Sequence, residues 1–368
     1  MKRWNESEKK PDLILLLATL LLLTIGTVMI YSSSSILAME RFRDGQFFLK
    51  KQLFFVCLGL GIMVFATRIP HYKLRKLAWP GIILSAFFLL LIWIPHLGIR
   101  AGGANRWLNL GIFSFQVSEM VKVALILFLA HYLTDKVNCI RDFRQGLLIP
   151  LAVTGGLTGL IVLQPDFGTT VIIAIITFLM IYLAGGRIVH IAGLTALFLP
   201  VAVGMLLFKS YRITRLMAFL DPWKDPRRSG FQIIQSLISF GSGGPFGVGI
   251  GDGMQKLFYL PEPHTDFILA VIAEESGFIG VGLILFLYVI LIVRGFQISL
   301  KAPDLFGNLL AAGLTMMIAL EAFINIAGVM GLIPLKGLAL PFLSYGGTSL
   351  IMSLTAVGIL LNISSYES

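Results

Sequence analysis

Charged residues are scarce in this chain. Asp, Glu, Lys and Arg make up 13% of its 368 residues, whereas they make up about a quarter of a typical soluble domain. No long polar stretch is present from which a large soluble catalytic domain could be built, while 57% of the chain is hydrophobic and its mean hydropathy is +0.89. A chain with too few charges to coat its own surface needs a solvent other than water. We therefore expect an integral membrane protein.

Cysteine and clustered histidine are lacking too. Cys57 lies in an apolar run and Cys139 in a polar loop, with no CxxC motif and no histidine nearby, which argues against a disulfide scaffold and against a structural zinc site. The five histidines are scattered and form no HExxH motif. Residues 241–253 contain seven glycines, but no Lys-Ser/Thr follows them and we expect no strand before them. Neither a P-loop nor a dinucleotide site is therefore predicted.

Apolar runs of the length that crosses a bilayer, about 20 residues, occur ten times. They cover 13–33, 51–69, 77–97, 116–134, 146–164, 167–185, 188–208, 266–296, 305–330 and 340–363. The predicted fold is thus an all-α integral membrane protein, a single polytopic domain over residues 1–368 with ten transmembrane helices. An even number of spans places both termini on the same side of the membrane.

Lys and Arg in the loops indicate which side that is. Counted over all loops they divide 14 to 14, but without the long 209–264 connection they divide 14 to 7 in favour of the side that holds the N-terminus. We therefore expect both termini in the cytoplasm. The net charge of +10 then reflects basic loops that lie on anionic lipid headgroups, and we expect no nucleic-acid partner.

The 209–264 connection is expected to be one large extracytoplasmic loop between the seventh and eighth spans. Six Lys and Arg residues fall within 209–228. In 231–240, a helix would place Phe231, Ile234, Leu237 and Ile238 on one face, which predicts a helix that lies in the membrane interface.

Ionisable residues inside spans are costly, so they are candidates for function. Glu119 and Lys122 are spaced by three residues, share one helix face and can form an ion pair. Such a pair can join helices or contact a substrate, and the sequence leaves both open. Upstream, Arg106 precedes Trp107, and a guanidinium group suits recognition of a diphosphate.

A second polar cluster opens the eighth predicted span. Asp266 either caps the helix that follows it or is a carboxylate at the rim of a cavity, with His264 beside it as a group able to take a proton. Glu274 would lie about 80° round the helix and roughly 12 Å deeper, so it can share that cavity.

Residues 334–349 form a third cluster, which includes Lys336 and Ser344. Proline and glycine break the helix there, and small hydroxyl groups can satisfy the freed backbone groups. Broken helices are tolerated at membrane depth where they line a water-filled cavity. Because such helices occur in transporters, a transporter is one functional hypothesis.

The three clusters together resemble the SEDS family (shape, elongation, division and sporulation), the FtsW/RodA/SpoVE group. The matching stretches are GANRWL at 103–108, FQVSEMVK at 115–122, QPDFGT at 164–169, Gln235-Ser to Gly251, LPEPHTDFI at 260–268 and LPFLSYGGTS at 340–349. Val117, Pro263 and Thr348 depart from the residues usual in the family, but none replaces a charged position. The dipeptide Lys336-Gly337 looks closer to the division and sporulation members than to RodA.

This resemblance implies a peptidoglycan glycosyltransferase of the cytoplasmic (inner) membrane, which polymerises lipid II, the undecaprenyl-diphosphate-linked disaccharide-pentapeptide, together with a class B penicillin-binding protein. The family's essential aspartate falls on Asp266, which we expect to be catalytic as a general base in an inverting displacement. Arg106, Glu119, Lys122 and Lys336 match other polar positions of the family. His264, Glu274 and Ser344 complete the expected substrate-binding set.

A divalent cation, Mg²⁺ or Mn²⁺, could bind at the diphosphate, although no ligand cluster in the sequence demands one. The alternatives to an enzyme are a lipid II flippase or other transporter, and a structural scaffold of the division machinery. For the partner's membrane helix we predict a groove between the eighth and ninth spans, where small residues such as Gly307 and Ala311 would permit close approach.

Overall fold

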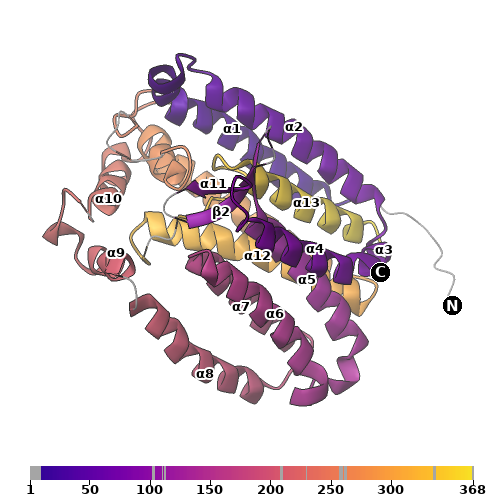
Figure 1. The fold of residues 1–368 in the computed structure, drawn as a ribbon. Coiled ribbons are helices and arrows are strands. Elements are labelled where there is room, and N and C mark those ends of the chain that lie inside the picture. The colour runs from indigo at the N-terminus through magenta and orange to yellow at the C-terminus, as the bar shows by residue number, and fades with distance from the viewer. Residues whose placement is uncertain are drawn as a thin grey trace.

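The computed structural model describes residues 10–101, 104–109, 111, 113–207, 210–228, 230–256, 260, 263–334 and 337–366. These residues form a bundle that is almost entirely helical (Figure 1). The helices are α1 (Leu13–Phe42), α2 (Phe47–Arg68), α3 (His71–Leu74), α4 (Ala78–Leu91), α5 (Val117–Asp135), α6 (Leu148–Leu163), α7 (Phe167–Leu183), α8 (Ile188–Leu207), α9 (Ser210–Leu220), α10 (Phe231–Gly243), α11 (Ile268–Leu300), α12 (Leu305–Val329) and α13 (Gly347–Ser364). Three strands, β1 (Gly98–Ala101), β2 (Ala104–Asn109) and β3 (Ser114–Gln116), lie between α4 and α5.

Eight helical segments of the described chain are long and apolar enough to cross a membrane. They are Leu13–Phe42, Phe47–Arg68, His71–Leu91, Val117–Asp135, Phe143–Leu163, Ile268–Leu300, Leu305–Val329 and Gly347–Ser364. Two shorter apolar helices, Phe167–Leu183 and Ile188–Phe198, lie where the sixth and seventh spans were predicted. The chain is therefore a multi-pass membrane protein, and the count of ten spans stays a prediction.

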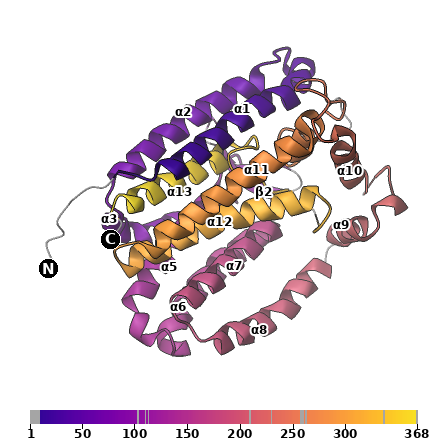
Figure 2. The ribbon, with the colours of Figure 1, turned by 180° about the vertical axis from the view of Figure 1, so that it is seen from behind.

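The start of α1 and the end of α13 lie at one end of the bundle, which we call the terminal end (Figures 1 and 2). Asp12 begins α1 because its carboxylate accepts a hydrogen bond from the backbone N–H of Leu15 (2.9 Å). Its own backbone N–H donates to the hydroxyl of Ser364 near the C-terminus (3.0 Å), and Nε of Arg294 donates to its carboxylate (2.9 Å). The first span thus begins, and the last span ends, on the same side of the bundle.

Close helix packing follows from small residues. A Cβ atom on Gly59 of α2 would lie 2.6 Å from a methyl group of Leu354 on α13, and one on Gly358 of α13 would lie 2.6 Å from the carbonyl oxygen of Met63 on α2. At Gly358 the close atom belongs to the backbone, so glycine is needed there for this approach of α2 and α13, the arrangement expected where helices associate in a lipid solvent.

α12 is the central helix of the bundle and packs against α5, α7, α11 and α13 (Figure 2). The predicted partner groove is wrong for this reason. Ala311 is fully buried, and Gly307 is surrounded by Asp304, Ala302 and His71, so neither residue can face a second protein's helix.

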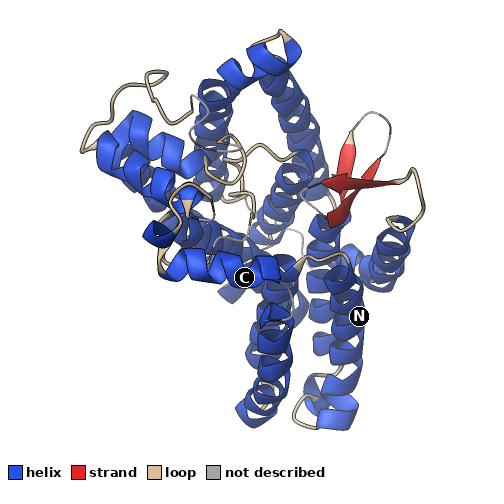
Figure 3. Ribbon diagram, turned by 60° about the vertical axis from the view of Figure 1, so that its left-hand side comes forward, coloured by secondary structure: helices blue, strands red, loops and turns tan. Residues whose placement is uncertain are grey.

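A small antiparallel sheet in strand order β1-β2-β3 departs from the all-α prediction (Figure 3). In it the Cα atom of Trp107 pairs with those of Ile99 and Gln116. The strands are three to six residues long, too short for their alternation to stand out between two apolar spans. The last predicted span is also too long, because α13 begins at Gly347 and residues 338–346 are not helical.

A helix, α10, is present where the interfacial helix was predicted, and its position in the membrane interface stays a prediction. Leu237 and Ile238 are 40% and 42% exposed, whereas Ile233 and Ile234 are buried, and α10 packs along α11. The hydroxyl of Ser236 donates to the carbonyl oxygen of Val329 at the end of α12 (2.7 Å).

Candidate functional site

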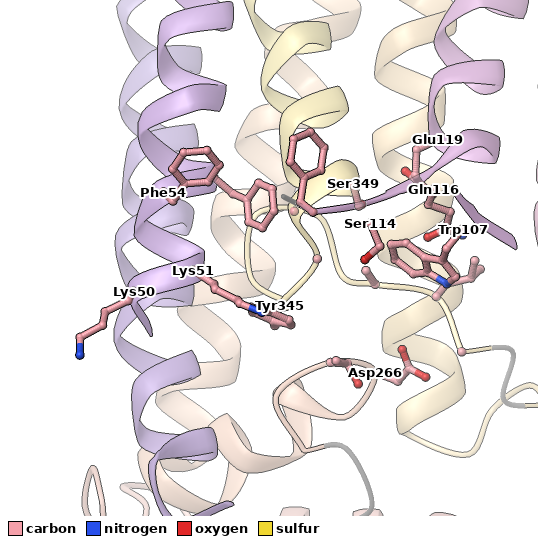
Figure 4. A pocket seen from close by; sticks show the side chains of 18 residues that line it. Lys50, Lys51, Phe54, Trp107, Ser114, Gln116, Glu119, Asp266, Tyr345 and Ser349 are labelled. Carbon is pink, nitrogen blue, oxygen red and sulfur yellow. The ribbon is translucent and has the colours of Figure 1, made fainter. Parts of the chain in front are cut away.

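A cavity of about 600 Å³ opens at the end of the bundle opposite the terminal end (Figure 4). The segments around it are the first turns of α2, α5 and α13, the strands β2 and β3, the turn before α11, and the loop before α13. The side chains and backbone that line it belong to Lys50, Lys51, Phe54, Phe55, Trp107, Phe113, Ser114, Gln116, Glu119, Thr265, Asp266, Gly337, Leu338, Ala339, Tyr345, Gly346, Gly347 and Ser349.

Asp266 is half-buried in this cavity, and one residue, Phe267, separates it from the start of α11. Its backbone carbonyl accepts a hydrogen bond from Nδ2 of Asn325 on α12 (3.0 Å), and the same amide donates to the carbonyl oxygen of Leu338. A Cβ atom on Gly337 would lie 3.0 Å from Oδ2 of Asp266, and Gly337 has φ of 63°. Glycine is needed there both for this left-handed conformation and for the approach to the carboxylate.

The capping interpretation of Asp266 is wrong. α11 begins at Ile268 with Phe267, not Asp266, at the N-cap position, and the Phe267 side chain makes no capping hydrogen bond. The interpretation of Asp266 as a cavity carboxylate agrees with its position in the lining.

Glu119, Lys122 and Glu321 form a buried triad beneath the cavity. Nζ of Lys122 lies 2.8 Å from Oε1 of Glu119 and also binds Oε1 of Glu321, which comes from α12. All three side chains are buried, and Glu119 is the member that reaches the cavity lining. The predicted pair of Glu119 and Lys122 is present, but it is part of a cluster with two carboxylates and one ammonium group.

Arg106 is not among the residues that line the cavity. Its Nη2 atom donates to the carbonyl oxygen of Pro165 (2.7 Å), and its Nε atom lies 3.9 Å from Oδ2 of Asp166. Successive side chains of a strand point to opposite faces, so on β2 it is Trp107 that faces the cavity while Arg106 ties the strand to the turn between α6 and α7.

His264 packs into the protein between aromatic rings. Its ring centroid lies 4.5 Å from that of Phe48 and 5.6 Å from that of Tyr345, and the side chain is buried. Burial, and secondarily the charge of Arg41, lower the pKa of His264 to about 4. At neutral pH its imidazole is therefore uncharged, and it is a weak base outside the cavity lining.

The other three predicted binding residues have different positions. Glu274 accepts hydrogen bonds from the backbone N–H groups of Met254 (2.9 Å) and Gln255 (3.1 Å) and does not line the cavity, so the expectation that it shares the cavity with Asp266 is wrong. The hydroxyl of Ser344 donates to the carbonyl oxygen of Thr265 (2.6 Å) and joins the loop before α13 to the turn before α11. Lys336 lies outside the described residues.

The glycine-rich segment 241–253 fills a break in α11. Gly277 has φ of 65° and ψ of −164°, which interrupts the helix. The carbonyl oxygens freed there accept from Val248 (3.0 Å) and Gly249 (3.1 Å), and the N–H groups of Phe278 and Ile279 donate back to the segment. The first turns of α11, which follow Asp266, are thereby held by backbone hydrogen bonds to this segment.

Carboxylates reinforce this attachment. Glu275 accepts from the hydroxyl of Ser32 on α1, from the backbone N–H of Gly251 (3.0 Å) and from Nζ of Lys256 (2.7 Å). Glu275 and Lys256 are both buried. The break in α11 near the site is therefore stabilised by specific hydrogen bonds and a buried ion pair.

The cell cycle protein family of FtsW, RodA and SpoVE matches residues 12–368 of this chain. The chain belongs to the FtsW/RodA/SpoVE family. The resemblance drawn from the sequence motifs is confirmed.

Two relatives show the degree of similarity. Stage V sporulation protein E of Bacillus subtilis (strain 168) is 46% identical over 357 residues, which are 97% of this chain and 98% of that protein. A protein of Trichlorobacter lovleyi named probable peptidoglycan glycosyltransferase FtsW is 47% identical over 354 residues, which are 96% of this chain and 93% of that protein.

Solved structures of the FtsW/RodA/SpoVE family share the fold. A chain of the structure titled "Structural coordination of polymerization and crosslinking by a peptidoglycan synthase complex" is 30% identical with a TM-score of 0.80, over 96% of this chain and 97% of that chain. The rod shape determining protein RodA of Thermus thermophilus is 25% identical with a TM-score of 0.69, over 98% of this chain and 97% of that chain.

Four residues at the site of this FtsW/RodA/SpoVE-family chain escaped the sequence analysis. Glu321 and Asn325 come from α12, and Lys50 and Lys51 come from α2. Glu321 is the single charged residue within 305–330, and a charge inside a span is a functional signal, so it could have been found. The lysines resembled ordinary interfacial anchors.

The described residues contain no group of three or more His, Cys, Asp or Glu side chains placed to hold a metal ion. Asp266 and Glu119 are the described carboxylates that line the cavity, and Glu119 is already paired with Lys122.

Proposed function

We propose that this protein polymerises lipid II into β-1,4-linked glycan at the outer face of the cytoplasmic membrane, with Asp266 as the general base. The chain is a peptidoglycan glycosyltransferase, the activity for which its relatives at 43–47% identity are named. The observation that supports the assignment of Asp266 is its position in the lining of the cavity at this end of the bundle.

The proposed reaction is a single displacement. The carboxylate of Asp266 takes the proton of the acceptor sugar's hydroxyl group, and the hydroxyl oxygen then attacks the anomeric carbon of a lipid-linked donor. The bond from that carbon to the diphosphate breaks, and the lipid diphosphate leaves with the electron pair. Attack opposite the leaving group converts an α linkage into a β linkage, so no covalent intermediate on the protein is required.

Orientation supports an extracytoplasmic reaction. The loop charges favour a cytoplasmic position of the termini, and the cavity lies at the end of the bundle opposite Asp12 and Ser364. In this orientation the segment 209–264 is extracytoplasmic, and the cavity opens on the outer side of the membrane, where the peptidoglycan cell wall is built.

A class B penicillin-binding protein is the proposed partner, because glycan strands need cross-linking by another chain. Its membrane helix would lie on the outward face of α11, where Phe278, Leu283, Phe286 and Val289 are all at least half exposed. Exposed apolar side chains alone fit lipid equally well, so the support for this face is its continuity with the segment that holds Asp266.

A divalent cation remains part of the proposal only as a companion of the substrate. When bound, it would supply positive charge that neutralises the charge developing on the leaving group. Asp266 and Glu119 are the described carboxylates of the cavity lining that could contact it.

A flippase is the second candidate, because the triad of Glu119, Lys122 and Glu321 lies buried beneath the cavity. The test uses purified protein in liposomes with fluorescent lipid II. Glycan polymer on a gel supports the glycosyltransferase, whereas transfer of lipid II between leaflets without polymer would support the flippase.

A further inference from the structure

Arg106 was predicted to bind the diphosphate of the substrate, but its position outside the cavity lining leaves the diphosphate without that cation. Its guanidinium group binds the carbonyl of Pro165 and lies outside the cavity lining. A diphosphate carries charge that must be balanced when it enters a partly apolar site. The cations that do line the cavity, among the described residues, are Lys50 and Lys51.

These two adjacent lysines differ in their surroundings. Nζ of Lys50 lies 2.8 Å from Oδ2 of Asp44, and its side chain extends away from the cavity in Figure 4. Lys51 extends toward Tyr345 in the same view. Of the described carboxylates, none is within ion-pair distance of Lys51, and Nζ of Lys51 lies 4.3 Å from the centroid of the Phe47 ring. An aromatic ring holds an ammonium group in place without cancelling its charge.

The wall that α2 contributes is graded from basic to apolar. Phe54 and Phe55 also line the cavity and lie one helical turn beyond Lys50 and Lys51, a rise of about 6 Å. A lipid diphosphate has the same order, a charged group followed by a hydrocarbon chain. An ammonium group at the outer turn and aromatic side chains at the next therefore match it in polarity and direction.

We propose that Lys51 binds the diphosphate of the polyprenyl-linked substrate, with the first units of its hydrocarbon chain against Phe54 and Phe55. This inference rests on the proposed function for the identity of the substrate. Asp266, the proposed general base, belongs to a different segment of the cavity lining, the turn before α11.

The test measures binding directly, without turnover. Protein in nanodiscs of phosphatidylcholine is titrated with undecaprenyl diphosphate and, separately, with undecaprenol, which has the same chain and no phosphate. Lys51→Gln is compared with Lys51→Arg and with Lys50→Gln, a matched control that removes the same charge from the neighbouring residue. Both positions changed are exposed, and thermal unfolding checks that each of the three variants is folded.

We expect Lys51→Gln to weaken binding of undecaprenyl diphosphate by about tenfold to a hundredfold, the loss typical of one charge-assisted hydrogen bond. Binding of undecaprenol should not change, Lys51→Arg should retain most of the affinity, and Lys50→Gln should stay within about twofold of the wild type. Equal losses in Lys51→Gln and Lys50→Gln would overturn the proposal.

A second arm separates the substrate from ordinary lipid headgroups. The titration is repeated in nanodiscs that contain phosphatidylglycerol. If phosphatidylglycerol competes with undecaprenyl diphosphate and this competition disappears in Lys51→Gln, Lys51 is a headgroup anchor and the proposal is wrong. Failure of the wild-type protein to polymerise lipid II would instead refute the proposed function, and the binding titration would still report on Lys51.

Discussion

Replacement of Lys122 by methionine removes the cation that Glu119 and Glu321 share. Methionine keeps much of the volume of the lysine stem, so the change is mainly one of charge. Both carboxylates are buried, and Lys122 donates to each of them. The substitution therefore leaves two uncompensated acids side by side inside the bundle.

The expected size of the effect follows from this geometry. Removal of one partner from a buried ion pair costs about 3–5 kcal/mol, and Lys122→Met should reach the upper part of that range because two acids lose their partner. Glu119→Gln should cost less, about 1–3 kcal/mol, since Lys122 keeps its bond to Glu321 and the new amide oxygen can still accept. The free energies of unfolding should therefore rank wild type, Glu119→Gln, Lys122→Met, from most to least stable.

Thermal and denaturant unfolding in one detergent provide the comparison, with Lys136→Met as the control. Lys136 follows the same helix and is exposed, so its loss should change stability by less than about 0.5 kcal/mol. A swap of Glu119 and Lys122 adds a sharper test, because it would place a carboxylate beside Glu321 and should not restore stability. A Lys122→Met protein as stable as Glu119→Gln, or recovery in the swap, would refute the triad.

Three further predictions test other parts of the structure. Burial lowers the pKa of His264 in the folded protein to about 4, against 6.5 for the free side chain. Below pH 6.5 the unfolded chain therefore gains a proton that the folded chain does not, and about 3 kcal/mol of the free energy of unfolding is lost as the pH falls toward 4. The melting temperature of His264→Gln should depend less on pH over this window, and equal slopes for the variant and the wild type would contradict the lowered pKa of His264. Glu275→Gln leaves Lys256 buried without its partner, so it should speed proteolysis of residues 241–256 more than the double change with Lys256→Met does. Phe286→Ala on α11 should reduce co-purification of a class B penicillin-binding protein and leave polymerisation without the partner unchanged, whereas unchanged co-purification would place the partner elsewhere.

The spans could be predicted from the sequence because a bilayer demands long apolar runs, and each predicted run contains a helix. The position of Asp266 in a cavity was one of two open interpretations. Its distinction from a helix cap depends on where α11 begins, at Ile268, and helix ends shift by a residue or two for reasons that local sequence does not contain.

The failures have a common physical origin in contacts between distant segments. Glu321 joins Lys122 across 199 residues, and its partner could not be known before the packing of α5 on α12. The position of Arg106 outside the cavity lining could not be foreseen because strand β2, which places neighbouring side chains on opposite faces, was not predicted. Glu274 was placed in the cavity from helix geometry alone, whereas the break at Gly277 brings the glycine-rich segment against it.

The most direct test of the central claim is the rate at which purified Asp266→Asn polymerises fluorescent lipid II in nanodiscs, read as glycan on a gel. Asparagine keeps the shape of the side chain but cannot take the proton of the acceptor hydroxyl, so the rate should fall by about 10²–10⁴-fold while the melting temperature stays near that of the wild type. Asp221→Asn, at an exposed position outside the cavity, should polymerise like the wild type. A folded Asp266→Asn protein that polymerises lipid II at the wild-type rate would contradict the assignment of Asp266 as the general base.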